Sequence, residues 1–253
     1  MAPYSRRPSG ARGNAFLDSL SASDAALIIP LLVPIHCRTG ERLGHDVSGS
    51  AVIYFPTTLV ASVGLGGDGS GVGLVGREGL IGWTAMLDRS EAGEEARALF
   101  DGGTALTLPV KRMRIACFAS PTLSMDLLRF VQSYAVQLSC SVRSSNSATL
   151  KQRLSAWLLM LHDRLEGDAI AITHEALAQQ LRVRRASITD LLHILEGELA
   201  LRCERRTIHM RDRSQLEASA GRAYGGGANR SRPPRVFRSP ACNGERELRA
   251  AVQ

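Results

Sequence analysis

Residues 173–196, THEALAQQLRVRRASITDLLHILE, have the spacing of two short amphipathic helices joined by a tight turn. Thr173 is a favourable N-cap for the first helix. The apolar residues of each helix fall on one face, and they are Leu177, Ala178, Leu181, Ile188, Leu191, Leu192 and Leu195. This pattern is typical of a helix-turn-helix, whose second helix enters the major groove of DNA.

The second helix begins with residues that can reach phosphates or base edges, namely Arg184, Arg185, Ser187 and Thr189. An ordinary helical hairpin with a solvated basic face would show the same pattern. The remainder of the chain has to distinguish the two interpretations.

The composition is that of a globular chain with two modest domains, since 253 residues and a 44% hydrophobic content suffice for packed cores. The chain has 31 basic and 24 acidic residues, a net charge of +7. This excess suits a polyanionic partner without specifying one. Almost all basic residues are Arg, which a genome-wide base-composition bias also explains.

The five cysteines are scattered and form no CxxC pair, which argues against a zinc site, an iron–sulfur site or a disulfide framework; they are Cys37, Cys117, Cys140, Cys203 and Cys242. Reduced thiols in a cytoplasm are the plain interpretation. Residues 1–13 are charged with no apolar run behind them, unlike a secretory signal. The most apolar stretch, residues 26–35, is too short to span a membrane. We therefore expect a cytoplasmic protein without a membrane segment.

The N-terminal half has the character of a β-structure. Residues 1–13 are rich in Pro, Gly and Arg and predict a disordered lead. From residue 35 to 110, short β-prone runs alternate with Gly and Asp clusters. We predict that residues 14–120 form an antiparallel β-roll of about eight strands, with a helical insert at 83–87. The acidic pair Glu94-Glu95 is expected in a solvated loop.

A long helix is predicted to follow, because Pro121 suits the first turn of a helix. Its apolar residues step by four, three and four, as in a coiled-coil seam; they are Leu127, Val131, Tyr134 and Leu138. Residues 121–146 are therefore predicted to be a dimerisation helix with a hinge, the polar hinge lying at 144–149. Packing of this helix on its own β-roll is the alternative, and both can hold on opposite faces.

The C-terminal region, residues 147–224, is predicted to be a winged helix-turn-helix domain. It contains an amphipathic helix at 150–165, a short strand at 170–172 and the two helices quoted above. A β-hairpin follows, with Arg205 and Arg206 at its tip, and a closing helix ends the domain. Residues 225–253 predict a disordered basic tail. The expected fold class is α+β.

In this order of parts the chain resembles the Crp/Fnr family of bacterial transcription regulators. The resemblance is strongest in RLSAWLLMLHDRL, ITHEALAQQLRVRRASITDLLHILE and RDRSQLEASAGRAY, within residues 153–224. The N-terminal half is similar through VIYFP, VGLVGREGLIGWTAML and GTALTLP.

The resemblance implies a homodimer that binds a roughly palindromic site on double-stranded DNA, with recognition helix 184–197 of each subunit in one half-site. It also implies RNA polymerase as a further partner and no catalytic activity. The chain has no GxSxG or HExxH motif either. Arg185 would bind guanine and Arg184 a phosphate. The full set of implied DNA-binding residues is Thr173, His174, Arg184, Arg185, Ser187, Thr189, Arg205 and Arg206.

The chain departs from the family pattern in four places. Asp190 stands where many relatives have a second base-reading Arg. Arg182 occupies a turn position that requires a positive φ and usually has Gly. Leu199 and the pair Arg205-Arg206 also stand where Gly is common. These differences put a target site like that of the relatives in doubt.

The candidate ligand-binding residues are Gly82, Trp83 and Arg97. Nucleotide-binding relatives have a Gly-Glu pair where this chain has Gly82-Trp83, so the ribose-binding carboxylate is missing. Arg97 is near the phosphate-binding position but outside its usual Arg-Ser context. We therefore do not expect the β-roll to bind a cyclic nucleotide, and the sequence specifies no cofactor. A haem ligated by His36, His45 or Cys37 is the alternative that the sequence leaves open.

Two alternatives complete the predictions. A ligand-binding or interaction module with a degenerate DNA-binding domain is the alternative function. The GxGxxG match at residues 71–76 lies among β-prone, Gly-rich residues, which favours a strand hairpin over a dinucleotide site.

Overall fold

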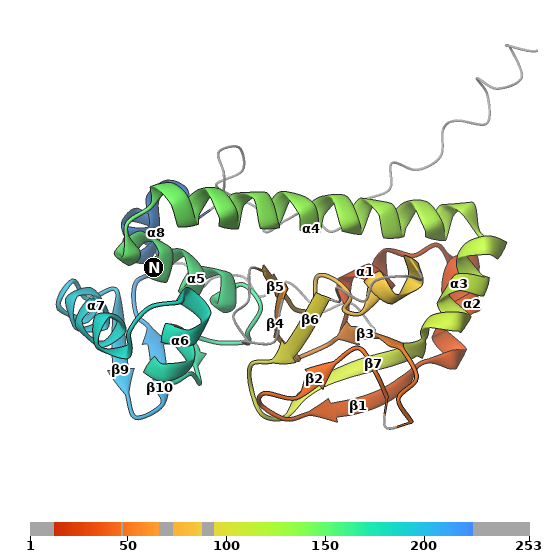
Figure 1. Cartoon of the computed structure of the whole chain (residues 1–253), viewed down its shortest axis with the longest axis horizontal. Coiled ribbons are helices and arrows are strands. Elements are labelled where there is room, and N and C mark those ends of the chain that lie inside the picture. The colour runs from red at the N-terminus through yellow and green to blue at the C-terminus, as the bar shows by residue number, and fades with distance from the viewer. Residues whose placement is uncertain (1–12, 47, 66–72, 88–93, 225–253) are drawn as a thin grey trace, which may run out of the picture.

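The computed structural model describes residues 13–46, 48–65, 73–87 and 94–224. It contains a β-roll, a C-terminal domain of helices around a small sheet, and one long helix, α4 (Pro121–Ser147), that lies along both (Figure 1). The predicted α+β class is confirmed.

Two short helices and a 3-10 turn precede the β-roll: α1 (Ala15–Ser19), α2 (Ala22–Ile28) and η1 (Ile29–Leu31). Asn14 caps α1 by accepting a hydrogen bond from the Leu17 amide. Its side-chain amide donates to the carbonyls of Pro56 and Gly79, each at 2.9 Å. Asn14 therefore fastens this helical entry to the β-roll while its own polar atoms are satisfied inside the core.

The β-roll consists of two antiparallel sheets in the described residues. Its strands are β1 (Val33–Cys37), β2 (Arg42–Leu43), β3 (Val52–Pro56), β4 (Ala61–Leu65), β5 (Gly73–Val75), β6 (Glu94–Ala98) and β7 (Gly103–Pro109). One sheet has the order β1-β7-β3 and the other β2-β6-β4-β5. The insert η2 (Trp83–Leu87) is a 3-10 helix. Gly73, inside the GxGxxG match, lies in β5 of a β4–β5 hairpin, as predicted.

The expectation of a solvated loop at Glu94-Glu95 is wrong. Both residues belong to β6, and Glu95 forms ion pairs with Arg97 and, at 3.2 Å, with Arg42 of the neighbouring strand β2. Glu is disfavoured in strands, so the local sequence did not predict a strand here. The ion pair with Arg42 on the neighbouring strand supports it.

The start of α4 is fixed by a buried polar cluster. Ser120 separates α4 from a preceding helix, α3 (Val110–Ala119), that the sequence did not reveal. The Ser120 hydroxyl accepts from the Leu123 amide at 3.2 Å and donates to Asp24 of α2. Asp24 also accepts from Thr122 at 2.7 Å. Burial acts to raise the pKa of Asp24, but the hydrogen bonds from Ser120, Ser21 and Thr122 to its charged form together outweigh burial, so the pKa lies below its ordinary value.

The predicted hinge at 144–149 is mostly helix. α4 continues to Ser147, and only Ala148 and Thr149 separate it from α5 (Leu150–His162). The Thr149 side chain caps α5 in a reciprocal arrangement with Gln152. The connection is therefore short and bounded by hydrogen bonds on both sides.

The four residues of the predicted dimer seam contact the chain's own β-roll, which is the alternative that the sequence left open. Tyr134 is buried in the core of the β-roll, and the other three pack against that core as partly buried side chains; the four are Leu127, Val131, Tyr134 and Leu138. The heptad spacing thus reports an intrachain contact. The exposed apolar residues of α4 lie on a broad outward face, ~60–180° around the helix axis from Leu127: Met125 (49% exposed), Leu128 (59%), Val136 (59%) and Val142 (52%).

The C-terminal domain is a winged helix-turn-helix. After α5 it contains β8 (Ala169–Ile170), α6 (His174–Leu181), α7 (Arg185–Gly197), β9 (Leu201–Glu204), β10 (Thr207–Met210), α8 (Arg213–Ala220) and η3 (Gly221–Ala223). The strands form a sheet of order β8-β10-β9. The turn between β9 and β10 is the wing.

The core of the C-terminal domain extends into the β-roll. Val60 and Leu74 belong to the same buried cluster as Trp157 of α5, and Leu99 and Phe100 pack against that cluster. Burial of apolar surface between the two parts favours their association. The C-terminal domain is therefore docked on the β-roll of its own chain.

Three non-glycine residues of the described chain have a positive φ: Arg182 (55°), Leu199 (61°) and Arg206 (61°). All three lie in the C-terminal domain, at positions where the sequence places a residue other than the expected Gly. A left-handed conformation costs a non-glycine residue ~1–2 kcal/mol.

Replacing Leu199, which is exposed, with Gly relieves this strain without loss of burial. We expect Leu199→Gly to raise the free energy of unfolding by ~1 kcal/mol, measured by urea denaturation. Ile194→Gly, at an exposed helical position of α7, is the control and should lower it by ~1 kcal/mol. Destabilisation by both variants would contradict the strain at Leu199.

Candidate DNA interface

The first helix of the motif, α6, is held at both ends. The Thr173 hydroxyl accepts a hydrogen bond from the Ala176 amide at 3.1 Å, as expected of an N-cap. At the other end, Nη2 of Arg153 in α5 donates to the Leu181 carbonyl at 2.8 Å. These bonds satisfy terminal backbone groups and fix α6 on α5.

The second helix, α7, buries Ile188, Leu192 and Leu195 and turns its opposite face outward. Arg184 is the N-cap residue, and both Arg184 and Arg185 are exposed. Neither guanidinium forms a hydrogen bond or ion pair with the part of the chain that the structure describes. Two free guanidiniums at the helix N-terminus, where backbone amides also point outward, form a site suited to phosphate and guanine.

Ser187 and Thr189 are half-buried, and Thr189 is already engaged within the protein. Its hydroxyl donates to the Arg185 carbonyl at 3.2 Å and lies 3.0 Å from Nδ1 of His174. This contact joins the start of α6 to the recognition helix. Thr189 and His174 therefore position α7, which leaves Arg185 as the stronger candidate for base contact.

His174, Arg185 and His193 lie close enough to influence one another. Burial, followed by the positive charges of Arg185 and His193, lowers the pKa of His174 below its ordinary value. His193 has a 68% exposed side chain on the outward face of α7, 3.8 Å from Glu196. The sequence analysis did not include His193, although its spacing of eight residues from Arg185 is a helical signal for the same face.

The remaining predicted residues lie apart from this cluster. Arg205 and Arg206 are exposed at the wing tip, on a separate element. Asp190 is exposed on α7, ~140° around the helix axis from Arg185. The expected divergence from the relatives' target sequence stays a prediction.

The candidate ligand residues are engaged within the β-roll. Gly82 has a φ of 82°, and a side chain there would meet the Val52 carbonyl at 2.6 Å. Trp83 packs edge-on against Tyr134 of α4 at 6.5 Å between ring centroids. Arg97 pairs with Glu95 and donates to the Gly40 carbonyl at 3.1 Å.

These contacts supply Arg97 with an internal counter-charge in place of a phosphate. Of the haem candidates, Cys37 is buried and burial raises its pKa to about 11, while His36 and His45 are exposed. The described chain gives these three residues no shared cluster of metal-binding side chains.

The comparisons agree with this geometry. Residues 152–219 match the family model of the Crp-like helix-turn-helix domain. No curated protein sequence matches the chain. In the described residues, no helix has the length and apolar character required to cross a membrane.

Several solved structures share the fold at low sequence identity. A Crp/Fnr-family transcriptional regulator from Eubacterium rectale has a TM-score of 0.61 at 17% identity, covering 79% of this chain and 95% of its own. FixK2 from Bradyrhizobium japonicum has 0.60 at 16%, covering 75% and 98%. A CRP/FNR-family regulator from Thermus thermophilus has 0.58 at 20%, covering 74% and 98%.

The fold and the outward-facing arginines of α7 define a β-roll protein with a DNA-binding domain of the winged helix-turn-helix class. The family model assigns residues 152–219 to the Crp-like helix-turn-helix domain, and the chain as a whole shares the fold of Crp/Fnr-family regulators. The predicted resemblance is thereby confirmed for this domain and for the fold.

The lowered pKa of His174 predicts a pH effect on stability. Because the folded state disfavours the protonated ring, the unfolded chain binds the proton first as the pH falls below 6.5. Stability should therefore drop between pH 6.5 and the lower folded-state pKa. In urea unfolding from pH 8 to pH 5, His174→Gln should lose less stability than the wild type. Equal losses would contradict this assignment.

Proposed function

We propose that this chain is a homodimeric, sequence-specific regulator that inserts α7 of each subunit into adjacent major grooves of double-stranded DNA. The observation that carries the proposal is the free pair Arg184 and Arg185 at the exposed start of α7, on a domain of the Crp-like helix-turn-helix family. Half-sites about one helical turn apart would match such a dimer.

The proposed DNA contacts are of two kinds, those that recognise a base and those that bind the phosphate backbone. Arg185 presents its guanidinium from the first turn of α7 and would bind guanine, worth ~1–3 kcal/mol of discrimination. Arg184 would bind the adjacent phosphate, and Ser187 would assist from the half-buried flank. Thr173, His174 and Thr189 hold the motif together, while Arg205 and Arg206 would contact the backbone from the wing.

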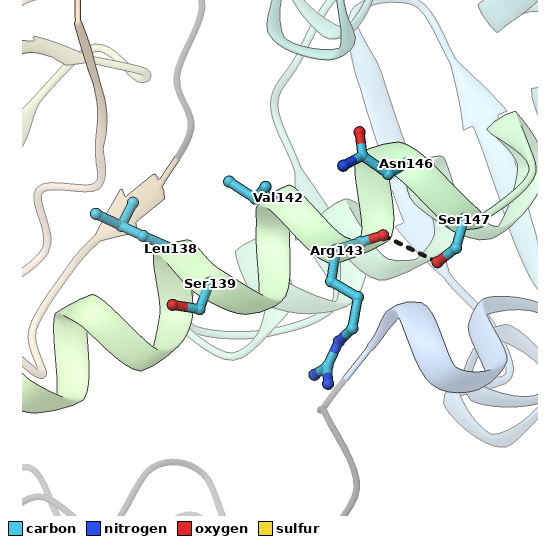
Figure 2. Close-up of a pocket in the computed structure, with 6 residues that line it drawn as sticks. All are labelled: Leu138, Ser139, Val142, Arg143, Asn146 and Ser147. Carbon is cyan, nitrogen blue, oxygen red and sulfur yellow. Dashed lines mark hydrogen bonds between the residues drawn. The ribbon is translucent and has the colours of Figure 1, made fainter.

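The exposed face of α4 is the proposed dimer contact. Its apolar residues, Met125, Leu128, Val136 and Val142, share a broad outward face with the small residues Ala135 and Ser139. Small residues let two helices approach closely, and apolar ones gain from burial. A pocket lies along the C-terminal part of this helix, and Figure 2 shows the residues that line it: Leu138, Ser139, Val142, Arg143, Asn146 and Ser147.

The wider assignments follow from this function. We propose residues 14–120 as the sensor domain, 121–146 as the dimerisation helix and 147–224 as the DNA-binding domain. The protein would act in the cytoplasm, where its DNA is, with RNA polymerase as a partner and no catalytic activity of its own. The internal pairing of Arg97 with Glu95 supports a β-roll that does not bind a cyclic nucleotide.

The DNA test is fluorescence anisotropy with genomic fragments over a salt series. Wild-type affinity should fall steeply with salt, with a slope of about −0.9 per neutralised phosphate. Arg185→Ala should lose preference for the best fragment by ~1–3 kcal/mol, whereas Arg184→Ala should mainly reduce the slope by about one. If no fragment competes better than random DNA, the interaction-module alternative replaces this function.

The dimer test places a charge on the proposed contact. Leu128→Glu should convert the dimer to a monomer in sedimentation equilibrium, because two carboxylates would be buried opposite each other. Ser133→Glu, exposed on α4 at ~140° around the helix axis from Leu128, is the matched control and should remain dimeric. A dimer for both variants would place the interface elsewhere.

A further inference from the structure

Arg164 lies in the turn after α5 and has a side chain that is only 6% exposed. Its Nε donates to Oε1 of Glu78 at 2.7 Å, and its Nη1 donates to the Met160 carbonyl at 2.7 Å. Its Nη2 donates to Oε1 of Gln137 at 3.0 Å and to the Leu74 carbonyl at 3.3 Å.

These partners come from three separate parts of the molecule. Leu74 and Glu78 belong to the β-roll: Leu74 lies on strand β5, and Glu78 lies in the turn that follows it. Gln137 belongs to the long helix α4, and Met160 to α5 of the DNA-binding domain. The Gln137 side chain also donates to the Leu74 carbonyl at 2.8 Å, which closes the network.

The turn is shaped to receive the Arg164 side chain. A methyl group on Gly76 would meet Cγ of Arg164 at 3.0 Å, so glycine leaves the space that the arginine stem occupies. The Gly76 amide donates to Oε1 of Glu78 at 3.1 Å, which orients the carboxylate toward the guanidinium. Glu78 has a 21% exposed side chain and supplies the only carboxylate within 4 Å of Arg164 in the described chain.

We propose that Arg164 is a positioning residue that locks the DNA-binding domain onto both the β-roll and α4, and thereby sets the spacing of the two recognition helices. A guanidinium is suited to this role because its planar donors can bind several acceptors at once in fixed directions. Removing one partner of a buried ion pair leaves the other charge or acceptor uncompensated, so a substitution of Arg164 is expected to weaken the docking of the domain.

The consequence for regulation is a direct mechanical connection. A movement of the β5–Glu78 turn displaces Arg164 and with it α5, on which α6 is fixed through Arg153 and Leu181. The signal path therefore runs from β5 through Arg164 to the recognition helix. The DNA consequence rests on the proposed function, whereas the coupling of the two domains does not.

The test compares the full-length wild type with Arg164→Met and Gln137→Leu. Arg42→Met is the matched control, because Arg42 is 72% exposed and pairs with Glu95 inside the β-roll. In differential scanning calorimetry, the wild type and Arg42→Met should unfold in one transition. Arg164→Met should show two, one for each uncoupled domain, and Gln137→Leu a broadened or split one.

The second readout is binding to palindromic DNA with half-site spacers varied by one and two base pairs. The wild type should bind DNA with one spacer length most tightly. In Arg164→Met, the ratio of affinities for the best and the other spacers should fall roughly tenfold, because the docked arrangement of the two domains is less populated. If Arg164→Met does not fold, the same two measurements on Gln137→Leu test whether the Arg164 network couples the domains.

A single transition together with an unchanged spacer preference in the uncoupling variants would overturn the proposal. An absence of DNA binding in every protein, including the wild type, would instead overturn the proposed function. Calorimetry would then still decide whether Arg164 couples the domains.

Discussion

The seating of α4 on its own β-roll is the contact on which the rest of the structure depends. Phe130 and Tyr134 stack on each other inside the β-roll core, and the buried Asp24 cluster fixes the first turn of the helix. With one face committed in this way, the apolar residues Leu128 and Val136 must face outward. The same helix carries Gln137 to the Arg164 network, so its position determines both the dimer contact and the pose of the DNA-binding domain.

The recognition motif combines tight anchoring with local strain. α6 and α7 are joined by the contact between His174 and Thr189, and α6 is fastened to α5. Arg182, Leu199 and Arg206 meanwhile adopt backbone conformations that suit glycine. The packing of the buried helix faces stabilises the domain enough to hold these three residues in strained backbone conformations. The exposed arginines are thereby carried by a helix that packing and hydrogen bonds hold in place.

The sequence was sufficient where structure is set by local spacing. The helix-turn-helix, its Thr173 cap and the wing all follow from periodicity and turn chemistry within about forty residues. The heptad in α4 was ambiguous, because spacing identifies a buried face but not the partner that buries it; Tyr134 proved to pack on the chain's own core. The ion pairs of Glu95 with Arg42 and of Arg164 with Glu78 could not be predicted, since these partners are distant in the sequence and only tertiary packing brings the charges together.

The most direct test of the account is disulfide scanning along α4 in full-length protein with Cys140 replaced by Ser. Ala135→Cys lies on the broad outward face and should form an interchain disulfide on mild oxidation, because related positions of a two-fold helix pair meet across the axis. Tyr134→Cys, one residue away and directed into the β-roll, should not cross-link. Cross-linking through position 134 but not position 135 would contradict the two-faced role of α4.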